Sequence, residues 1–120
     1  MNRFRITILL AALTGVLAIA APSQAALPKL TGTVGPGFTI TLTKLGKKVV
    51  TVPAGTYSIT VSDKSNIHNF HLRGPGRVNR EITAIGFVGT KTVVVKLVKG
   101  TYTYICDPHF TTMKGTFKVT

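Results

Sequence analysis

The 120-residue sequence has a single cysteine, Cys106, and only three acidic residues, Asp63, Glu81 and Asp107. A single cysteine cannot form a disulfide within the chain, so the sequence is not a disulfide-stapled scaffold. Three scattered carboxylates give no pair for general acid–base chemistry, which argues against catalysis by the chain itself. No helical periodicity persists for three turns after the N-terminal region, and there is no repeat or low-complexity tract. These absences leave a small non-helical domain that is not an enzyme.

The first 25 residues have the order of regions that is typical of a secretory signal peptide. Two arginines precede an apolar stretch, residues 6–21, and Ser23 and Ala25 stand at the spacing that a signal peptidase reads. The stretch of about 16 residues is shorter than the roughly 20 that a spanning helix needs, and an uncleaved anchor is the alternative. We expect cleavage after Ala25 and export of one domain, residues 26–120, to the periplasm, the cell envelope or the exterior, without stable membrane insertion.

The exported part is strongly basic. Without Arg3 and Arg5, 13 of the 15 lysines and arginines remain against three carboxylates, which gives a net charge of about +10. Such a surface attracts anionic partners, mainly by raising the encounter rate. The basic residues are scattered without an aromatic–basic cluster, so we expect no binding of nucleic acid. A solvated basic surface that only keeps the protein soluble is the alternative.

Short alternating segments between turn residues predict β-strands. Residues 37–46 alternate Phe38, Ile40 and Leu42 with threonines, the pattern of a half-buried strand. Further strands are predicted within residues 47–55, 55–63, 66–72, 89–100, 100–106 and 115–120. Residues 73–90 are the least regular part and predict a longer connection with one strand. About seven strands in fewer than 100 residues favour an all-β fold, a small antiparallel sandwich.

The alternation also predicts the direction of the cysteine. Tyr102, Tyr104 and Cys106 share one face of a strand, and two aromatic side chains on that face predict that it packs on the core. Cys106 is therefore expected at the inner end of this row, where the strand gives way to a loop. Asp107, the next residue, is expected to point outward as a local acidic spot.

The residues that bind soft or borderline metal ions form two groups, each at the end of a predicted strand. These residues are His68, His71, Cys106, His109 and Met113. Two histidines, a thiolate and a thioether together make the ligand set of a blue-copper site. One tight loop can offer Cys106 and His109 to the same ion. The remaining histidine must come from the first group, and the residue types alone leave His68 and His71 both possible.

Each of these residues also has an interpretation without metal. A lone buried cysteine is commonly a small apolar filler, a lone histidine is commonly a surface residue, and a lone methionine commonly packs in the core. A free thiol in an oxidising compartment is, however, at risk of oxidation or intermolecular pairing. Coordination occupies the sulfur of Cys106 as a thiolate and removes that risk. The joint pattern therefore favours a metal site.

Two segments resemble a known family. "YICDPHFTTMKGTFKV" is similar to the copper-binding end of cupredoxins such as plastocyanin, pseudoazurin and amicyanin, and "HNFHL" is similar to their His-Asn motif. The resemblance covers nearly all of the exported part. It implies a cupredoxin-like Greek-key β-sandwich of about seven to eight strands with one type-1 copper ion. The ligands it implies are His68, Cys106, His109 and Met113.

The resemblance also distinguishes the two histidines of the first group. The ligand histidine of the family is followed directly by asparagine, which selects His68 and gives Asn69 the role of tying the ligand loops together. His71 then corresponds to a second histidine of amicyanin-like members that is not a ligand. His109 would be the electron port. Three residues separate His109 from Met113, against four in plastocyanins and two in amicyanins, so the axial bond length stays open.

The resemblance implies a function as well. We expect an exported, monomeric type-1 copper protein that carries single electrons between extracytoplasmic redox proteins with acidic docking surfaces. The alternative from another class is a copper-trafficking or copper-sequestering protein of the same fold. A sandwich that has lost its metal and serves as a binding module is a third hypothesis, and the intact ligand set argues against it.

Overall fold

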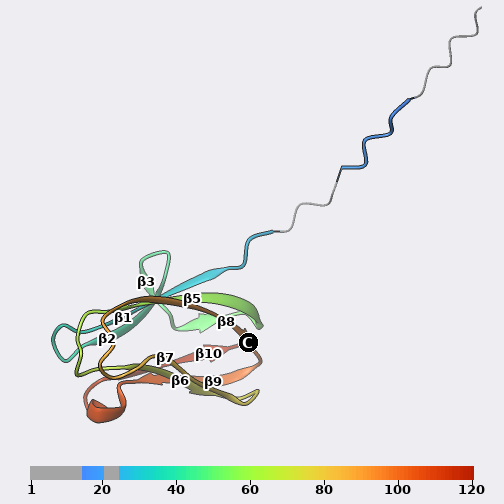
Figure 1. Ribbon diagram of the computed structural model, residues 1–120. Helices are drawn as coiled ribbons and strands as arrows, with labels where there is room; N and C mark the ends of the chain where they lie inside the picture. Colours follow the sequence, from blue (N-terminus) through green and yellow to red (C-terminus); the bar gives the residue numbers. More distant parts are fainter. Residues whose placement is uncertain (1–14, 21–24) are drawn as a thin grey trace, which may run out of the picture.

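The computed structural model describes residues 15–20 and 25–120 of the chain. From Lys29 onward the chain forms two five-stranded β-sheets that face one another as a sandwich (Figure 1). The predicted signal peptide, residues 1–25, falls largely outside the described residues, and its cleavage stays a prediction. Within the described part of the chain, no helix has the length and apolar character needed to cross a membrane.

Each sheet has its own set of strands, with a shared edge-to-edge logic. The first sheet has the order β3 (Lys47–Lys48), β2 (Ile40–Lys44), β1 (Lys29–Val34), β5 (Gly55–Asp63), β8 (Gly89–Leu97). The second has the order β4 (Thr51–Val52), β10 (Lys114–Val119), β9 (Gly100–Ile105), β6 (Phe70–Gly74), β7 (Val78–Thr83). The loops that follow β5 and β9 end at the same end of the sandwich.

The strand pairing is largely antiparallel, with two exceptions. β1 pairs in parallel with β5, and β4 pairs in parallel with β10. The sheets are therefore mixed, whereas the sequence pattern predicted an antiparallel sandwich. Eight of the ten strands have five or more residues, and β3 and β4 have two each. The predicted all-β sandwich of about seven to eight strands is confirmed.

Individual elements agree with the alternation to different degrees. β5 has the predicted bounds, and residues 73–90 contain one strand, β7, as expected. Residues 47–55 do not form one strand but divide into β3 and β4, which belong to different sheets. Val49 and Val52 are buried and Val50 is exposed, since the chain crosses from one sheet to the other here. β1 was not predicted.

Aromatic side chains of the second sheet form the part of the core that leads to Cys106. Tyr102, Tyr104 and Cys106 are all buried, which confirms the predicted inward row. The Tyr102 ring stacks on Phe117 with 5.4 Å between ring centroids, and the Tyr104 ring stacks on Phe70 at 5.6 Å. These stacked rings add packing energy to the area that they bury. The strand that carries Cys106 is therefore held firmly up to its last residue.

Candidate metal centre

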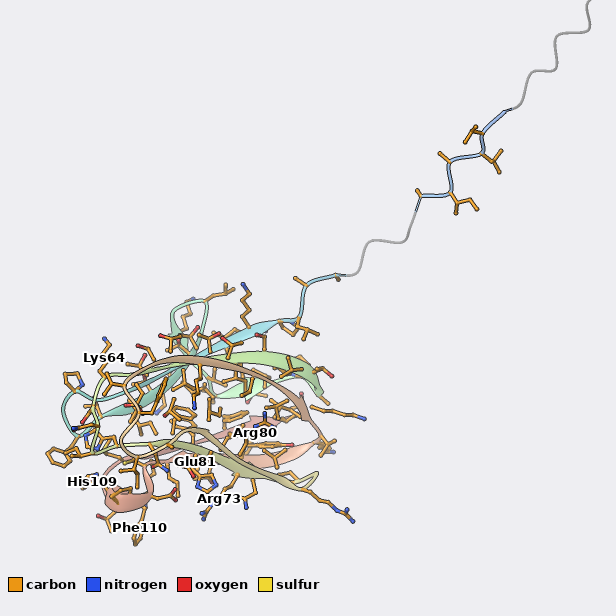
Figure 2. All side chains as sticks on the ribbon, viewed as in Figure 1. Lys64, Arg73, Arg80, Glu81, His109 and Phe110 are labelled. Atoms are coloured by element: carbon orange, nitrogen blue, oxygen red, sulfur yellow. The ribbon has the colours of Figure 1, made fainter. Side chains whose placement is uncertain are left out.

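Two loops at one end of the sandwich carry the predicted ligands. The first, between β5 and β6, contains His68 and Asn69, and the second, between β9 and β10, contains residues 106–113. Figure 2 shows His109 and Phe110 at this end, on the loop after β9. Residues about forty positions apart in the chain are thus brought together.

The second loop is built by hydrogen bonds between its own backbone groups. Asp107–His109 forms one turn of 3-10 helix, in which the His109 N–H donates to the Cys106 carbonyl at 3.0 Å. The Met113 N–H donates to the His109 carbonyl at 2.8 Å, and the Cys106 N–H donates to the Met113 carbonyl at 3.0 Å. Pro108 fits the first turn because its missing N–H would have no partner there. These bonds place the buried Met113 directly beside Cys106.

Three donor atoms from the two loops converge on one point. The Cys106 Sγ lies 3.6 Å from His68 Nδ1 and 3.5 Å from His109 Nδ1, and the two Nδ1 atoms are 3.1 Å apart. A point equidistant from the three atoms lies about 2 Å from each, the usual bond length from imidazole nitrogen or thiolate to a first-row metal ion. The three side chains therefore fit one ion, and we call them the donor cluster.

The donor cluster is sheltered from solvent on most sides. Cys106 and His68 are fully buried, and His109 is partly exposed. The His68 Nε2 atom is buried without a hydrogen-bond partner among the described residues, so its Nδ1 is the nitrogen with partners, both of them in the cluster. Such a site excludes water from the thiolate and leaves one imidazole near the surface.

Phe38 contacts both imidazoles. Its ring meets His68 edge to face at a centroid distance of 5.4 Å and His109 at 4.9 Å. The sequence pattern placed Phe38 in an inward strand row, and this is wrong, because the strand begins only at Ile40 and the Phe38 side chain is 61% exposed. The chain turns through Gly35-Pro36-Gly37 just before it, which frees the ring to cover the cluster.

Asn69 and Asp107 connect the two loops by a pair of hydrogen bonds. The Asn69 Nδ2 donates to Asp107 Oδ2 at 2.7 Å, and the Asp107 N–H donates to Asn69 Oδ1 at 2.7 Å. Asn69 follows His68, and Asp107 follows Cys106, so this pair fixes the spacing of two cluster residues. The prediction that Asp107 points outward as an acidic spot is wrong, because its carboxylate is taken up by neighbouring donors.

The electrostatics around Asp107 keep it ionised. Burial raises the pKa of its carboxyl, but the hydrogen bonds from Asn69 and His71 and the positive charges of His71, when protonated, and Arg73 outweigh burial. The net effect holds the pKa below its usual range. Asp107 is therefore an anionic acceptor beside the cysteine.

His71 lies outside the donor cluster. Its imidazole contacts Asp107 and Asn79 instead of the three donor atoms. Asn79 and Arg73 were not singled out in the sequence, because they belong to strands and carry no metal-ligand signature. Only their register in the sheet brings them to Asp107.

Comparison with known proteins agrees with this geometry. The model of the copper-binding proteins of the plastocyanin/azurin family matches residues 37–120, more than half of the chain. The chain belongs to this family. No curated protein matches this cupredoxin.

Solved structures of blue copper proteins have the same fold as this cupredoxin. Rusticyanin from Thiobacillus ferrooxidans is 23% identical, with a TM-score of 0.55 over 77% of this chain and 76% of that one. Auracyanin A, a "blue" copper protein from the green thermophilic photosynthetic bacterium Chloroflexus aurantiacus, is 21% identical, with a TM-score of 0.54 over 77% and 98%.

The cofactor of this cupredoxin is copper. The family binds copper, and the donor cluster with the adjoining Met113 fits a single type-1 ion. A set of imidazole, thiolate and thioether is softer than the oxygen ligands that calcium or magnesium requires. The predicted copper ion is confirmed.

Proposed function

We propose that this cupredoxin is a one-electron carrier whose copper ligands are His68, Cys106, His109 and Met113. The observation that carries the proposal is the convergence of three donor atoms from two loops within bonding reach of one ion. The buried Met113, held beside Cys106 by the backbone, supplies the thioether in the axial position that type-1 sites use.

Fast electron exchange requires a site that changes little between redox states. Copper supplies the one-electron couple when bound. The chain supplies rigidity, since Cys106 ends a strand packed on stacked aromatic rings and His68 immediately precedes Asn69 and β6. The paired hydrogen bonds between Asn69 and Asp107 hold the two loops at one spacing. The donors are therefore already in place before any partner arrives.

His109 is the proposed port for electrons. It is the most exposed member of the donor cluster, and Phe38 and Phe110 near it are 61% and 60% exposed. Figure 2 places His109 and Phe110 together at the tip of the sandwich. An apolar surface around a partly exposed imidazole favours brief contact with another protein, because it sheds water readily and holds no strong charge pair.

The partners proposed are extracytoplasmic redox proteins with acidic docking surfaces. The net charge of about +10 after loss of the predicted signal peptide supports such partners by long-range attraction. The same composition, poor in carboxylates, supports a carrier without enzymatic activity of its own. Export, to the periplasm or beyond, and a monomeric state complete the proposal.

The deciding experiment is a visible spectrum of the purified residues 26–120 after addition of copper(II) and then ascorbate. A strong thiolate-to-copper charge-transfer band that bleaches on reduction and returns on oxidation supports the carrier. Preferential binding of copper(I) with no stable oxidised form would instead establish copper trafficking or sequestration. Zinc in the protein after expression is exchanged first, since imidazole and thiolate also bind zinc.

A further inference from the structure

His71 is a buried polar side chain with no role in the proposed ligand set. It is 8% exposed and lies on β6, whose register aligns it with Ile105 of β9 and with Glu81 of β7. The side chain is therefore fixed by both neighbouring strands. Burial of an imidazole at this position is costly unless its nitrogens have hydrogen-bond partners.

Both ring nitrogens have such partners. The Nδ1 atom lies 2.8 Å from Asp107 Oδ2, and the Nε2 atom lies 2.6 Å from Asn79 Oδ1. A carboxylate oxygen can only accept, so Nδ1 carries the proton and donates it to Asp107. Asn79, on the adjacent strand β7, holds the other side of the ring.

The same Asp107 oxygen also accepts from Asn69. The two contacts, 2.7 Å from Asn69 Nδ2 and 2.8 Å from His71 Nδ1, approach one carboxylate oxygen from two residues of the first ligand loop and its strand. Arg73 adds only a long contact, 3.5 Å, from an exposed side chain. His71 is thus the main support of Asp107 from the body of the sheet.

We propose that His71 is a positioning residue of the metal centre, which holds the Asp107 carboxylate so that Asp107 and Asn69 keep the Cys106 and His68 loops in register. The path runs from the rigid sheet through His71 and Asp107 to the backbone next to the cysteine. Networks of this kind orient ligands and tune the metal although they do not touch it. The inference rests on the proposed ligands, His68 and Cys106.

The two nitrogens of His71 can be separated by substitution. In His71→Asn the side-chain amide nitrogen occupies about the position of Nδ1 and can still donate to Asp107. In His71→Gln the amide nitrogen reaches about the position of Nε2, so the contact with Asn79 is kept and that with Asp107 is lost. We expect His71→Asn to retain the copper(II) affinity, charge-transfer band and reduction potential of the wild type.

His71→Gln is expected to bind copper(II) about 10-fold or more weakly, with a shifted band and potential. His71→Ala removes both contacts and should behave like His71→Gln, and it replaces that variant if His71→Gln does not fold. Val95→Ala is the control for a general loss of stability, because it truncates a buried side chain of β8 in the other sheet. It should lower Tm while the copper affinity, band and potential stay unchanged.

The outcomes distinguish this inference from the proposed function. If the wild type shows no charge-transfer band, the proposed function fails. If the wild type shows the band and all His71 variants match it, His71 does not position the site. If His71→Asn is altered as much as His71→Gln, the bond to Asp107 is not the cause, and the inference is equally overturned.

Discussion

At the scale of single residues, His109 combines two properties, since it belongs to the donor cluster and also reaches the surface. We predict that His109→Gly keeps the fold and opens the copper to external ligands, because the missing side chain leaves a vacancy facing solvent. Electron exchange should slow. The visible spectrum with and without added imidazole, and the self-exchange rate, test this. Unchanged colour and unchanged rate would contradict the role of His109 as ligand and port.

Phe38 is expected to protect the metal. Its ring covers both imidazoles, so Phe38→Ala should speed the removal of copper by a chelator several-fold while Tm hardly changes, because the side chain is largely exposed. Phe110→Ala is the matched control, since this ring is equally exposed at the same end and makes no ring contact with either imidazole. Equal removal rates in the two variants would show that Phe38 does not shield the site.

The residues of the donor cluster were predictable from sequence, whereas their surroundings were not. His68, Cys106 and His109 carry chemistry in their residue type and spacing. Phe38 looked like one more member of an alternating row, and only the turn before it decides otherwise. Asp107 looked like a surface acid, because the amide of Asn69 that binds it is 38 positions away in the sequence.

At the scale of elements, the turns opposite the metal centre are joined by one hydroxyl group. The Val98 N–H donates to Tyr102 Oη at 2.9 Å, and this oxygen also lies 3.1 Å from the Pro75 carbonyl. The turn between β6 and β7 is thereby linked to the turn between β8 and β9.

Tyr102→Phe should therefore lower the free energy of unfolding by about 1–3 kcal/mol, since buried backbone groups lose their partner. The copper spectrum should stay that of the wild type, because the hydroxyl lies at the far end of β9 from Cys106. Urea unfolding measures the change. Tyr57→Phe, which loses a single bond to the Pro53 carbonyl, should cost less, and an equal loss would argue against the linking role.

Strands with uninterrupted alternation were predictable, and β1 shows why others were not. Its buried positions are Leu30, Gly32 and Val34, a period of two whose middle member has no side chain. Glycine is required there because a Cβ would press on the ring of Phe70 at 2.8 Å and on Val61 at 2.9 Å. The contact that makes β1 fit the core thus erases its hydrophobic signal.

At the scale of the whole molecule, copper should act as a clamp on the fold, because binding to the native state alone adds to stability. At free copper of about 100 times Kd we expect Tm to rise by roughly 10–20 °C. Calorimetry with and without copper measures this. Cys106→Ala should lose the response, and an undiminished rise in that variant would place the metal elsewhere.

The basic surface leads to a prediction about salt. Reduced protein should be oxidised by anionic hexacyanoferrate(III) more slowly as ionic strength rises, since the attraction is screened over about 10 Å at 0.1 M. Oxidation by cationic hexaammineruthenium(III) should instead become faster. Stopped-flow rates over a salt series test both. The same salt dependence for both reagents would mean that the net charge does not steer encounters.

The direction of β1 decides how this protein can be attached to other objects. β1 starts at Lys29 and runs toward the metal centre, where Gly35 lies close to His68, so its first residue is about 16 Å back along the strand from Val34. A linker joined before Lys29 would leave from the rear of the sandwich. An electrode or a fused enzyme tethered there would hold the protein with the His109 imidazole turned toward the open solution.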